Sequence, residues 1–292
     1  MEKQLAVATM LKDDYQFLEK WIRHYATVVD DKSDLYVVSH GEDARVREIA
    51  AGCSIIVIPH FENGSQFEPR RRGMFFGLIQ MLGNYFKHVL VTDVDEFVVL
   101  DPTLGAKLGD YLDNRDFAGR VLSPLGFDVV HKPSAEPAPF DFDVPLTMQR
   151  QHGYLEGAYT KPCIFREAPV DGGNAHFING EPWDIDPNLM LFHMKYFDRD
   201  IGLSLASKRL ETVSNYEKLA KTHRIGGWHN RGEKLLTTID NLENAEIRGL
   251  TPEVVKEFSM TLTQEFISRG RFPWDISQMG PFSIPERFIG TV

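Results

Sequence analysis

Short apolar runs alternate with amphipathic stretches over the first third of the chain. The apolar runs are of strand type and occupy residues 5–10, 35–39, 54–58 and 89–92. Between them, apolar residues recur at three- and four-residue spacing, which predicts amphipathic helices. These helices span about residues 12–25, 42–51 and 69–86. Such alternation predicts an α/β fold with a mostly parallel sheet and helices on both of its faces.

Residues that favour helix ends support these boundaries. Asp13 or Asp14 precedes the first helix and can accept a hydrogen bond from its free backbone amides. Gly52 follows the second helix, where glycine is a common C-terminal cap. Pro59 ends the third strand, because proline cannot donate to a sheet ladder.

The rest of the chain divides into an irregular part and a helical part. Residues 116–190 include Pro-rich and Gly-rich stretches, which predict loops and mixed strands. Helical periodicity returns in three segments, at 198–219, 232–244 and 251–268. The tail, 272–292, is aromatic and Pro-rich without a clear period. We therefore expect residues 1–200 to form an α/β domain and residues 201–292 to form a helical C-terminal extension packed on it.

A cluster of acids interrupts the pattern after the fourth strand. Asp93, Asp95 and Glu96 stand between two apolar runs, although carboxylates are costly to desolvate unless they are paired or bind a cation. In an extended segment Asp93 and Asp95 would face the same way. A divalent metal is the usual counter-ion for such a pair, and ligands of open α/β sheets bind beyond the carboxyl ends of strands. The alternative is a solvated turn.

The amino-acid composition excludes or disfavours several classes of protein. The chain has 292 residues, of which 42% are hydrophobic, enough for a substantial core. The formal net charge of -10 does not favour bulk nucleic-acid binding. The only cysteines, Cys53 and Cys163, form neither a disulfide framework nor a zinc pattern and fit a reducing compartment. No apolar run approaches the ~20 residues of a transmembrane segment. We expect a cytoplasmic protein, with peripheral attachment to the membrane left open.

Several segments, taken in order, resemble glycosyltransferases of the GT-A fold, specifically the family 2-like group and its relative, family 92. Lys12-Asp13-Asp14 and the following Phe-Leu-Glu-Lys-Trp at 17–21 are similar to the opening segment of that group. Asp-Val-Asp-Glu-Phe at 93–97 resembles its Asp-X-Asp-Glu-Phe motif. Lys-Pro-Cys-Ile-Phe-Arg at 161–166 and Leu-Phe-His-Met-Lys-Tyr at 191–196 are similar to two later segments. The match ends near residue 200.

The resemblance implies a fold, an activity and a donor. The fold would have a mixed central sheet flanked by helices, with a nucleotide-sugar half at about 1–100 and an acceptor half at about 101–200. The activity would be a hexosyltransferase type of sugar transfer, with inversion, from a nucleotide-diphosphate donor of the UDP type. The acceptor would be a saccharide, lipid-linked or protein hydroxyl. Bound Mn²⁺ or Mg²⁺ would neutralise charge on the leaving diphosphate.

The same resemblance assigns the metal ligands. Asp93 and Asp95 would carry the metal and donor-phosphate motif. In such enzymes a later histidine often completes the metal shell, and His193 is the first candidate and His176 the second. For either histidine, the alternative is a hydrogen-bonded structural role.

Donor contacts are assigned by position. Met10 and Lys12 follow the first strand and would hold the base and ribose, with Asp14 as a further possibility. Arg71 lies among three arginines at the predicted start of the helix at 69–86, where a helix N-terminus attracts phosphate and arginine binds it bidentately. The alternative is a solvated basic stretch. Lys161 comes from a matched segment and would face the phosphates or the acceptor.

An inverting transfer also needs a base that deprotonates the acceptor hydroxyl, usually a carboxylate. The sequence offers Glu156 and Asp128, with Asp184 ranked lower, although for each the pattern favours an ordinary surface acid over the base. Glu96 alternates away from Asp95 in an extended segment and can be structural.

The sequence lacks the motifs that are typical of other classes of enzyme. A haloacid dehalogenase-type phosphatase expects a threonine two residues beyond the second Asp, where this chain has Phe97. The phosphate-binding loop, the dinucleotide fingerprint and the serine-hydrolase elbow are also missing from the sequence. The remaining alternative is a non-catalytic nucleotide- or carbohydrate-binding protein that retains the GT-A fold.

Overall fold

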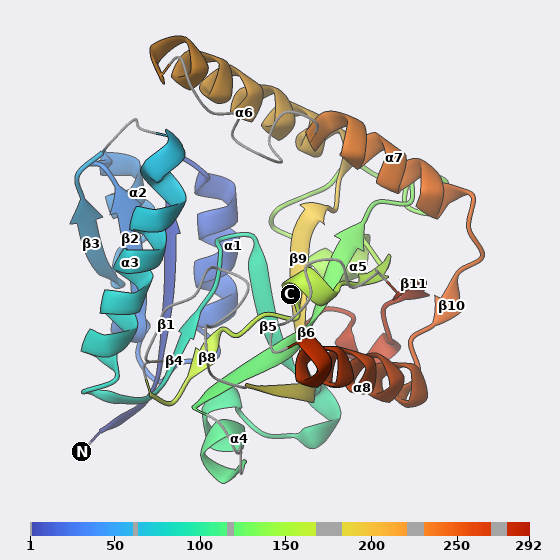
Figure 1. The fold of residues 1–292 in the computed structure, drawn as a ribbon, viewed down its shortest axis with the longest axis horizontal. Helices are drawn as coiled ribbons and strands as arrows, with labels where there is room; N and C mark the ends of the chain where they lie inside the picture. The colour runs from blue at the N-terminus through green and yellow to red at the C-terminus, as the bar shows by residue number, and fades with distance from the viewer. Residues whose placement is uncertain (1, 61–63, 116–119, 168–182, 221–230, 270–278) are drawn as a thin grey trace.

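The computed structural model describes residues 2–60, 64–115, 120–167, 183–220, 231–269 and 279–292. It contains a mixed central sheet of parallel and antiparallel strands that is flanked by helices (Figure 1). The α/β class predicted from the alternation of elements is therefore confirmed. None of the helices in these ranges is long and apolar enough to span a bilayer.

The first half of the sheet is parallel and follows the predicted strands. Its strands are β1 (Lys3–Leu11), β2 (Leu35–His40), β3 (Ser54–Ile58) and β4 (Phe86–Val91). They lie in the order β3-β2-β1-β4. Seven consecutive residues of β1 are buried, as expected for a parallel strand that is covered on both faces.

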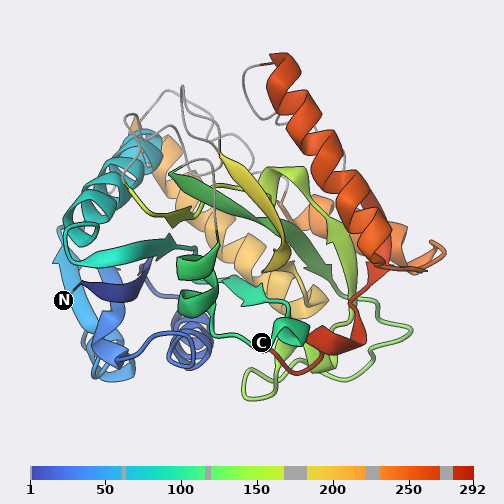
Figure 2. The same ribbon diagram turned by 90° about the horizontal axis from the view of Figure 1, so that it is seen from below.

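Three helices connect these strands: α1 (Tyr15–Tyr25), α2 (Ala44–Ile49) and α3 (Gly64–Leu82). Figure 2 shows α1 and α3 on opposite faces of the parallel strands. Asp14 occupies the N-cap position of α1, but its side chain makes no capping hydrogen bond. Asp43 does cap α2, through the amides of Arg45 and Val46.

The start of α3 corrects one prediction. The helix begins at Gly64, five residues before Pro69, so the three arginines at 70–72 do not stand at its N-terminus. Pro69, where the sequence predicts that the helix begins, lies inside the helix. The argument that the helix N-terminus helps these arginines bind phosphate therefore fails, and their function depends on what their side chains contact.

The second half of the sheet is mostly antiparallel. Its strands are β5 (Glu96–Leu100), β6 (Val121–Val130), β7 (His152–Leu155), β8 (Ile164–Phe165) and β9 (Asp184–Tyr196). Strand β8 joins β4 to β6 by antiparallel pairing. Strand β9 pairs with β6 in parallel and with β5 in antiparallel register. The short helices α4 (Leu108–Asn114) and α5 (Leu146–Gln149) lie in the connections.

In the described residues after 198, the three predicted helices are present, together with two short strands that were not predicted. The helices are α6 (Arg199–Ala220), α7 (Arg231–Glu243) and α8 (Pro252–Arg269). In Figure 1, α6 and α7 lie across the top of the molecule. Strand β11 (Met279–Ser283) pairs with β7, and β10 (Arg248–Gly249) pairs with β11. A five-residue strand with Gly280 and Pro281 in its middle shows no alternation, which explains why it was missed. The domain division at residue 200 stays a prediction.

Candidate active site

The acids that follow β4 form a tight turn, called here the acidic turn (residues 93–96). The amide of Glu96 donates to the carbonyl of Asp93 over 3.1 Å, and the Glu96 carboxylate accepts from the amide of Asp93 over 2.9 Å. The segment is therefore not extended, and the expectation that Asp93 and Asp95 face the same way as alternate residues of a strand is wrong. The two carboxylates contact different partners.

Two aromatic residues of helix α1 form hydrogen bonds with the acidic turn and the residues next to it. The indole nitrogen of Trp21 donates to the hydroxyl of Thr92 over 2.9 Å. The hydroxyl of Tyr25 donates to the carbonyl of Glu96 over 3.1 Å and accepts from the amide of Val98 over 2.9 Å. Trp21 and Tyr25 are fully buried, where an unmade hydrogen bond is costly. The aromatic residues of the predicted helix therefore fix the backbone of the turn.

Cations compensate the acids on one side of the turn. Arg71 of α3 forms an ion pair with Asp93. The ammonium of Lys161 lies 2.6 Å from Glu96 Oε1 and 3.7 Å from Asp93 Oδ2. Glu96 and Lys161 are both buried, and burial makes such a pair costly to break. Glu96 is therefore a structural acid paired with Lys161, and the predicted donor residues Arg71 and Lys161 do lie beside Asp93.

A histidine compensates the acid on the other side. His193 Nε2 lies 3.6 Å from Asp95 Oδ2, and His193 Nδ1 lies 2.7 Å from Asp128 Oδ1. Strand register places it there, because His193 is directly opposite Glu96 on β5 and Asp128 on β6. The carbonyl of Asp95 also accepts from the amide of Met194 over 2.9 Å. The structure thus unites three predicted residues: Asp95, His193 and Asp128.

This arrangement shifts the ionisation of all three groups. Burial opposes charge on His193, but the charge of Asp128 and its hydrogen bond outweigh burial and raise the pKa of His193 to about 9. Burial also opposes charge on Asp95, yet its interactions with His193 lower the pKa of Asp95 to about 2. The pKa of Asp128 is held below its usual range, against burial, by Lys195 and His193. Without a bound metal, these pKa shifts favour a protonated His193 between the two carboxylates.

The segment after β7 closes over the histidine. The ring of Tyr159 stacks on that of His193, with centroids 3.9 Å apart and planes inclined by 31°. Lys195 Nζ lies 4.8 Å from the centre of the Tyr159 ring. This segment can approach β6 because residue 126 is glycine: a Cβ at Gly126 would collide with the backbone of Tyr159 and Thr160. Gly126 therefore positions an aromatic ring without touching the site itself.

The base candidates differ in their access to solvent. Asp128 is fully buried against His193. Glu156 is half-buried and caps a short 3₁₀ helix, Gly157–Tyr159, by accepting from the amide of Ala158 over 3.2 Å. Asp184, ranked lower, begins β9 and is half-buried. The catalytic role of each acid stays a prediction.

Other predicted residues lie where the first strand ends. Met10 is buried in β1, and Lys12 is exposed just beyond the strand. Burial, followed by the charge of Asp95, raises the pKa of Asp14 to about 6, which indicates that Asp14 lies close to the acidic turn. His176, the second metal candidate, lies outside the described residues.

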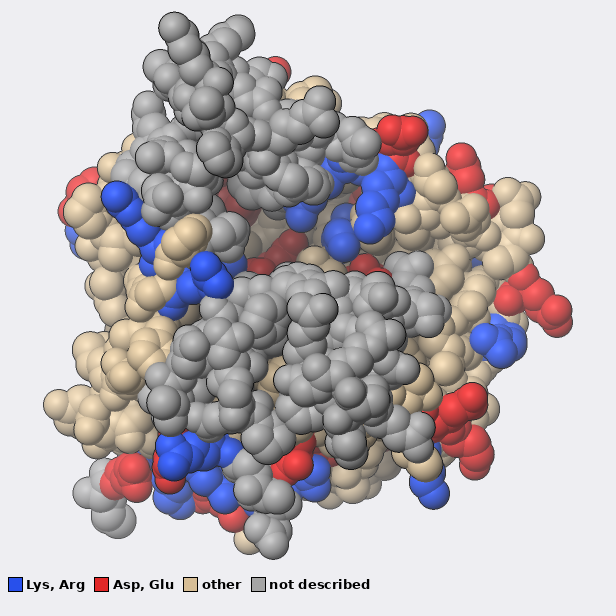
Figure 3. Space-filling view, viewed as in Figure 1, with Lys and Arg blue, Asp and Glu red and all other residues tan. Residues whose placement is uncertain are grey.

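The site has the charges of an ion-binding site but no ready-made metal shell. Figure 3 shows a face that is hollowed near its centre, where acidic side chains lie between two groups of Lys and Arg side chains. Within the described ranges, no three His, Cys, Asp or Glu side chains form a metal-ligand cluster. The 3.6 Å between Asp95 and His193 suits two ligands of one ion with bonds of about 2.0–2.2 Å. Asp93 is engaged by Arg71 instead.

Arg231 is a residue of this site that sequence reasoning missed. It is the first residue of α7. Its charge helps His193 to lower the pKa of Asp95 and offsets part of the rise in the pKa of Asp14 that burial causes. In the sequence it is one of 32 basic residues, and it lies beyond the segments that resemble a known family. No local signal distinguishes it.

Comparison with known proteins yields distant structural likenesses only. No family model matches the chain, and no curated protein matches it in sequence. Similar solved structures include the apo structure of the bifunctional glycosyltransferase WbbM, at 17% identity and a TM-score of 0.28, over 43% of this chain and 23% of that one. A mycobacterial protein is similar at 16% identity and a TM-score of 0.29, over 43% of this chain and 41% of that one.

A third similar structure is the mannosyltransferase PcManGT from Pyrobaculum calidifontis in complex with GDP-Man and Mn²⁺. It is 10% identical with a TM-score of 0.34, over 91% of this chain and 81% of that one. The matches to the first two structures cover less than half of those chains. Because these likenesses are so distant, the chemistry of the site rests on its own residues.

Proposed function

We propose that this protein is a metal-dependent glycosyltransferase of the GT-A type, which transfers a sugar from a nucleoside-diphosphate donor to an acceptor hydroxyl. The observation that carries this proposal is the acidic turn at the carboxyl end of β4, with Arg71 and Lys161 beside Asp93 and with His193 beside Asp95. Carboxylates suit a divalent cation, and guanidinium and ammonium groups suit phosphate oxygens. A diphosphate bound with a cation needs both kinds of group.

In this proposal Asp95 and His193, the latter after losing its Nε2 proton, are the first ligands of Mn²⁺ or Mg²⁺. Their facing atoms are 3.6 Å apart, and Asp128 holds the other nitrogen of His193, the usual way in which a ligand histidine is oriented. When bound, the metal would neutralise charge on the leaving diphosphate. Asp93 would become the third ligand when Arg71 leaves it for a phosphate of the donor.

The donor would lie along the end of β1. In this proposal Met10 and Lys12, at the end of β1, would contact the base and ribose, and Arg71 and Lys161, beside Asp93, would contact the phosphates. As the resemblance implies, we propose a donor of the UDP type, transfer of a hexosyl group, and a saccharide, lipid-linked or protein acceptor.

Of the two base candidates, Glu156 fits the role better. A general base must come within hydrogen-bond reach of the acceptor hydroxyl, and Glu156 is half-buried whereas Asp128 is fully buried. The pKa of Tyr196 rises to about 12 through burial, and the charges of Asp128 and Glu156 add to this rise. Glu156 therefore lies near the same end of β9. Inversion requires this base to act directly on the acceptor.

The test is a thermal-shift screen of nucleoside diphosphates with and without Mn²⁺, followed by calorimetry on the best ligand. We expect Mn²⁺-dependent stabilisation, because a ligand that binds only the folded state raises the melting temperature. Asp95→Ala is expected to weaken Mn²⁺-dependent binding by at least about 100-fold, equivalent to about 2.7 kcal/mol, while the circular dichroism spectrum is retained. Glu257→Ala, an exposed acid on α8, is the matched control.

Two results would count against the proposal. Unchanged affinity of Asp95→Ala for the nucleoside diphosphate with Mn²⁺ would remove the metal assignment. Tight binding without any release of nucleotide from nucleotide sugars would favour the alternative, a non-catalytic nucleotide- or carbohydrate-binding protein of the same fold. Turnover is measured as nucleoside diphosphate formed from UDP- and GDP-sugars in the presence of candidate acceptors.

A further inference from the structure

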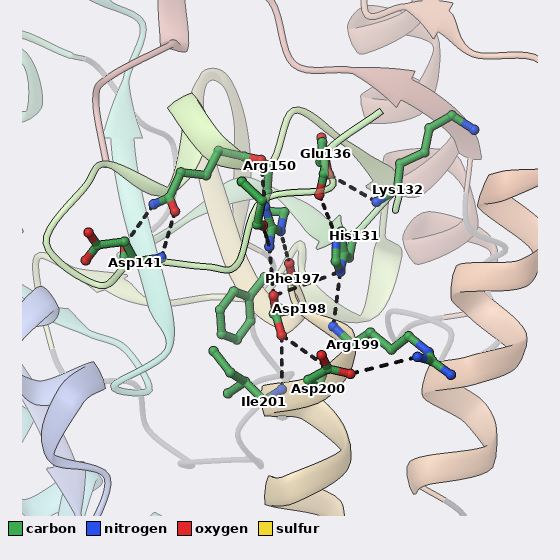
Figure 4. A network of polar contacts seen from close by, with 12 residues as sticks. His131, Lys132, Glu136, Asp141, Arg150, Phe197, Asp198, Arg199, Asp200 and Ile201 are labelled. Carbon is green, nitrogen blue, oxygen red and sulfur yellow. Dashed lines mark hydrogen bonds and ion pairs between the residues drawn. The ribbon is translucent and has the colours of Figure 1, made fainter. Parts of the chain in front are cut away.

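The start of helix α6 is fixed to the sheet by a buried ion pair. Asp198 Oδ1 caps the helix by accepting from the amides of Asp200 and Ile201, each over 3.0 Å. Its other oxygen lies 2.7 Å from Arg150 Nη2, and Arg150 Nε donates to the carbonyl of Phe197 over 2.8 Å. Figure 4 shows Asp198 between Arg150 and the first turn of α6. These contacts therefore fix the orientation of α6 relative to the end of β9.

Helix α7 is fixed beside it. Leu235, Ile239 and Leu242 pack in an apolar cluster with Val130 and Tyr196. The fit is close, since a Cβ at residue 202 of α6 would lie 2.7 Å from a methyl group of Leu235. At the other end of α7, the ammonium of Lys132 donates to the carbonyls of Leu242 and Glu243 over 3.3 and 3.0 Å.

This packing brings the first turn of α7 to the candidate active site. Val130 and Tyr196 are paired across β6 and β9, and the same two strands carry Asp128 and His193. Arg231, one turn before Leu235, is half-buried, and Lys234 is exposed three residues later on the same side of the helix. In Figure 3 a group of basic side chains borders the hollow where α7 begins in the matching view of Figure 1.

Arg231 differs from the other cations of the site in having no partner among the residues that the structure describes. Arg71, Lys161 and His193 each lie beside a carboxylate. No hydrogen bond or ion pair joins its guanidinium to another described side chain. Its charge nevertheless acts on Asp95, whose pKa it lowers together with His193, and on Tyr159, where it opposes the rise in pKa that burial causes. The guanidinium of Arg231 is therefore near the acidic turn and is not paired with a described carboxylate.

A nucleoside diphosphate brings several negative charges to a site that already holds Asp93, Asp95 and Asp128. The cations next to these acids are largely neutralised by them. Binding of the added phosphates therefore needs a cation that is not already paired with a carboxylate, in addition to any metal. A guanidinium suits this task, because it binds phosphate oxygens in pairs.

We propose that Arg231, assisted by Lys234, binds the diphosphate of the donor, so that the α6–α7 helix pair forms part of the donor site. The inference rests on the proposed function for the identity of the anion. It assigns a binding role to the C-terminal part of the chain, which the resemblance to known glycosyltransferases does not cover. The contact would be an electrostatic one between the guanidinium and phosphate oxygens.

Inorganic pyrophosphate is the probe that tests this contact without a nucleoside. Calorimetry with Mn²⁺ is expected to show at least tenfold weaker pyrophosphate binding to Arg231→Gln than to the unaltered protein, and partial recovery in Arg231→Lys. Lys234→Gln is expected to weaken binding about threefold and, because Lys234 is exposed, to leave folding intact. Lys256→Gln, which removes an exposed charge from α8, is the matched control and is expected to bind normally.

The outcomes separate this proposal from the proposed function. Equal pyrophosphate affinity in Arg231→Gln, Lys234→Gln and the unaltered protein would overturn the role of α7, even if sugar transfer is observed. A loss of equal size in the Lys256→Gln control would also overturn it, because the effect would then be one of net charge. Arg231-dependent binding of pyrophosphate, with neither preference for nucleoside diphosphates nor turnover of nucleotide sugars, would support this site and contradict the glycosyltransferase.

Discussion

The two sides of the acidic turn compensate their charges in different ways. On the Asp93 side, Arg71 is a long side chain on a helix, and nearly a third of the Asp93 side chain is exposed. On the Asp95 side, His193 and Asp128 stand on paired strands and are buried. A partner on a flexible side chain can be exchanged for a ligand, whereas one set by strand register cannot. The Asp93 side is therefore suited to receiving phosphates and the Asp95 side to holding a metal in place.

The largest expected contrast is in stability. Asp128→Ala leaves His193 and Lys195 without their buried carboxylate, which typically costs about 3–5 kcal/mol. Asp93→Ala removes a partly exposed carboxylate and is expected to cost about 0–1 kcal/mol. Urea unfolding at pH 7.5 measures both changes in the free energy of unfolding. Equal losses of unfolding free energy in the two variants would contradict this difference, because they would mean that burial does not distinguish the two sides of the turn.

A smaller contrast is expected within the Asp93 side. Lys161→Met leaves Glu96 buried without its cation at 2.6 Å, and we expect a loss of about 2–4 kcal/mol. Arg71→Met removes a cation whose partner keeps access to water, so about 1 kcal/mol or less is expected. The double variant Lys161→Met/Glu96→Gln is the control: it should recover part of the loss, since both charges are removed. A cost for Arg71→Met as large as that for Lys161→Met would show that exposure of Asp93 does not matter.

The smallest expected effect concerns Asp14, at the entrance to the site. Its pKa rises from 3.8 to about 6 on folding, through burial and then the charge of Asp95. The folded state then binds more protons than the unfolded state between about pH 4 and 6, so the contribution of Asp14 to stability falls as pH rises through this window. Asp14→Asn should remove that fall and gain about 1–2 kcal/mol at pH 7.5 relative to pH 4.

Urea unfolding of Asp14→Asn and of the unaltered protein at both pH values measures this difference. Asp240→Asn, an exposed acid on α7, is the control and should show no such dependence. A gain that is equal at pH 4 and pH 7.5 would mean that the carboxylate of Asp14 is not destabilised by its surroundings.

The sequence predicts the parallel half of the fold well, because each strand and helix there has a clear period. It fails at β11, where Gly280 and Pro281 interrupt a short strand, and at the start of α3, where Pro69 is not the first helical residue. In both places local composition was a poor guide to a boundary that is set by packing.

The candidate site was predictable to the extent that its residues are locally unusual. Asp93 and Asp95 are acids between apolar runs, so their position alone indicates chemistry. The pairing of Asp128 with His193 depends on the register of β6 and β9 across more than sixty residues of sequence, and no local pattern contains it. Arg231 reaches the site only because α7 packs on those strands, which is a property of the tertiary structure.

Gly126 has a consequence for how chains of this kind can diverge. Even a methyl group at this position would collide with the backbone of Tyr159 and Thr160, so the position of the Tyr159 ring depends on a residue that has no side chain of its own. A lineage that replaces Gly126 must reroute the segment over β6 before it can keep an aromatic ring on His193. Glycine at this position is therefore a sequence marker for this arrangement, and a descendant that has lost it should differ at position 159 as well.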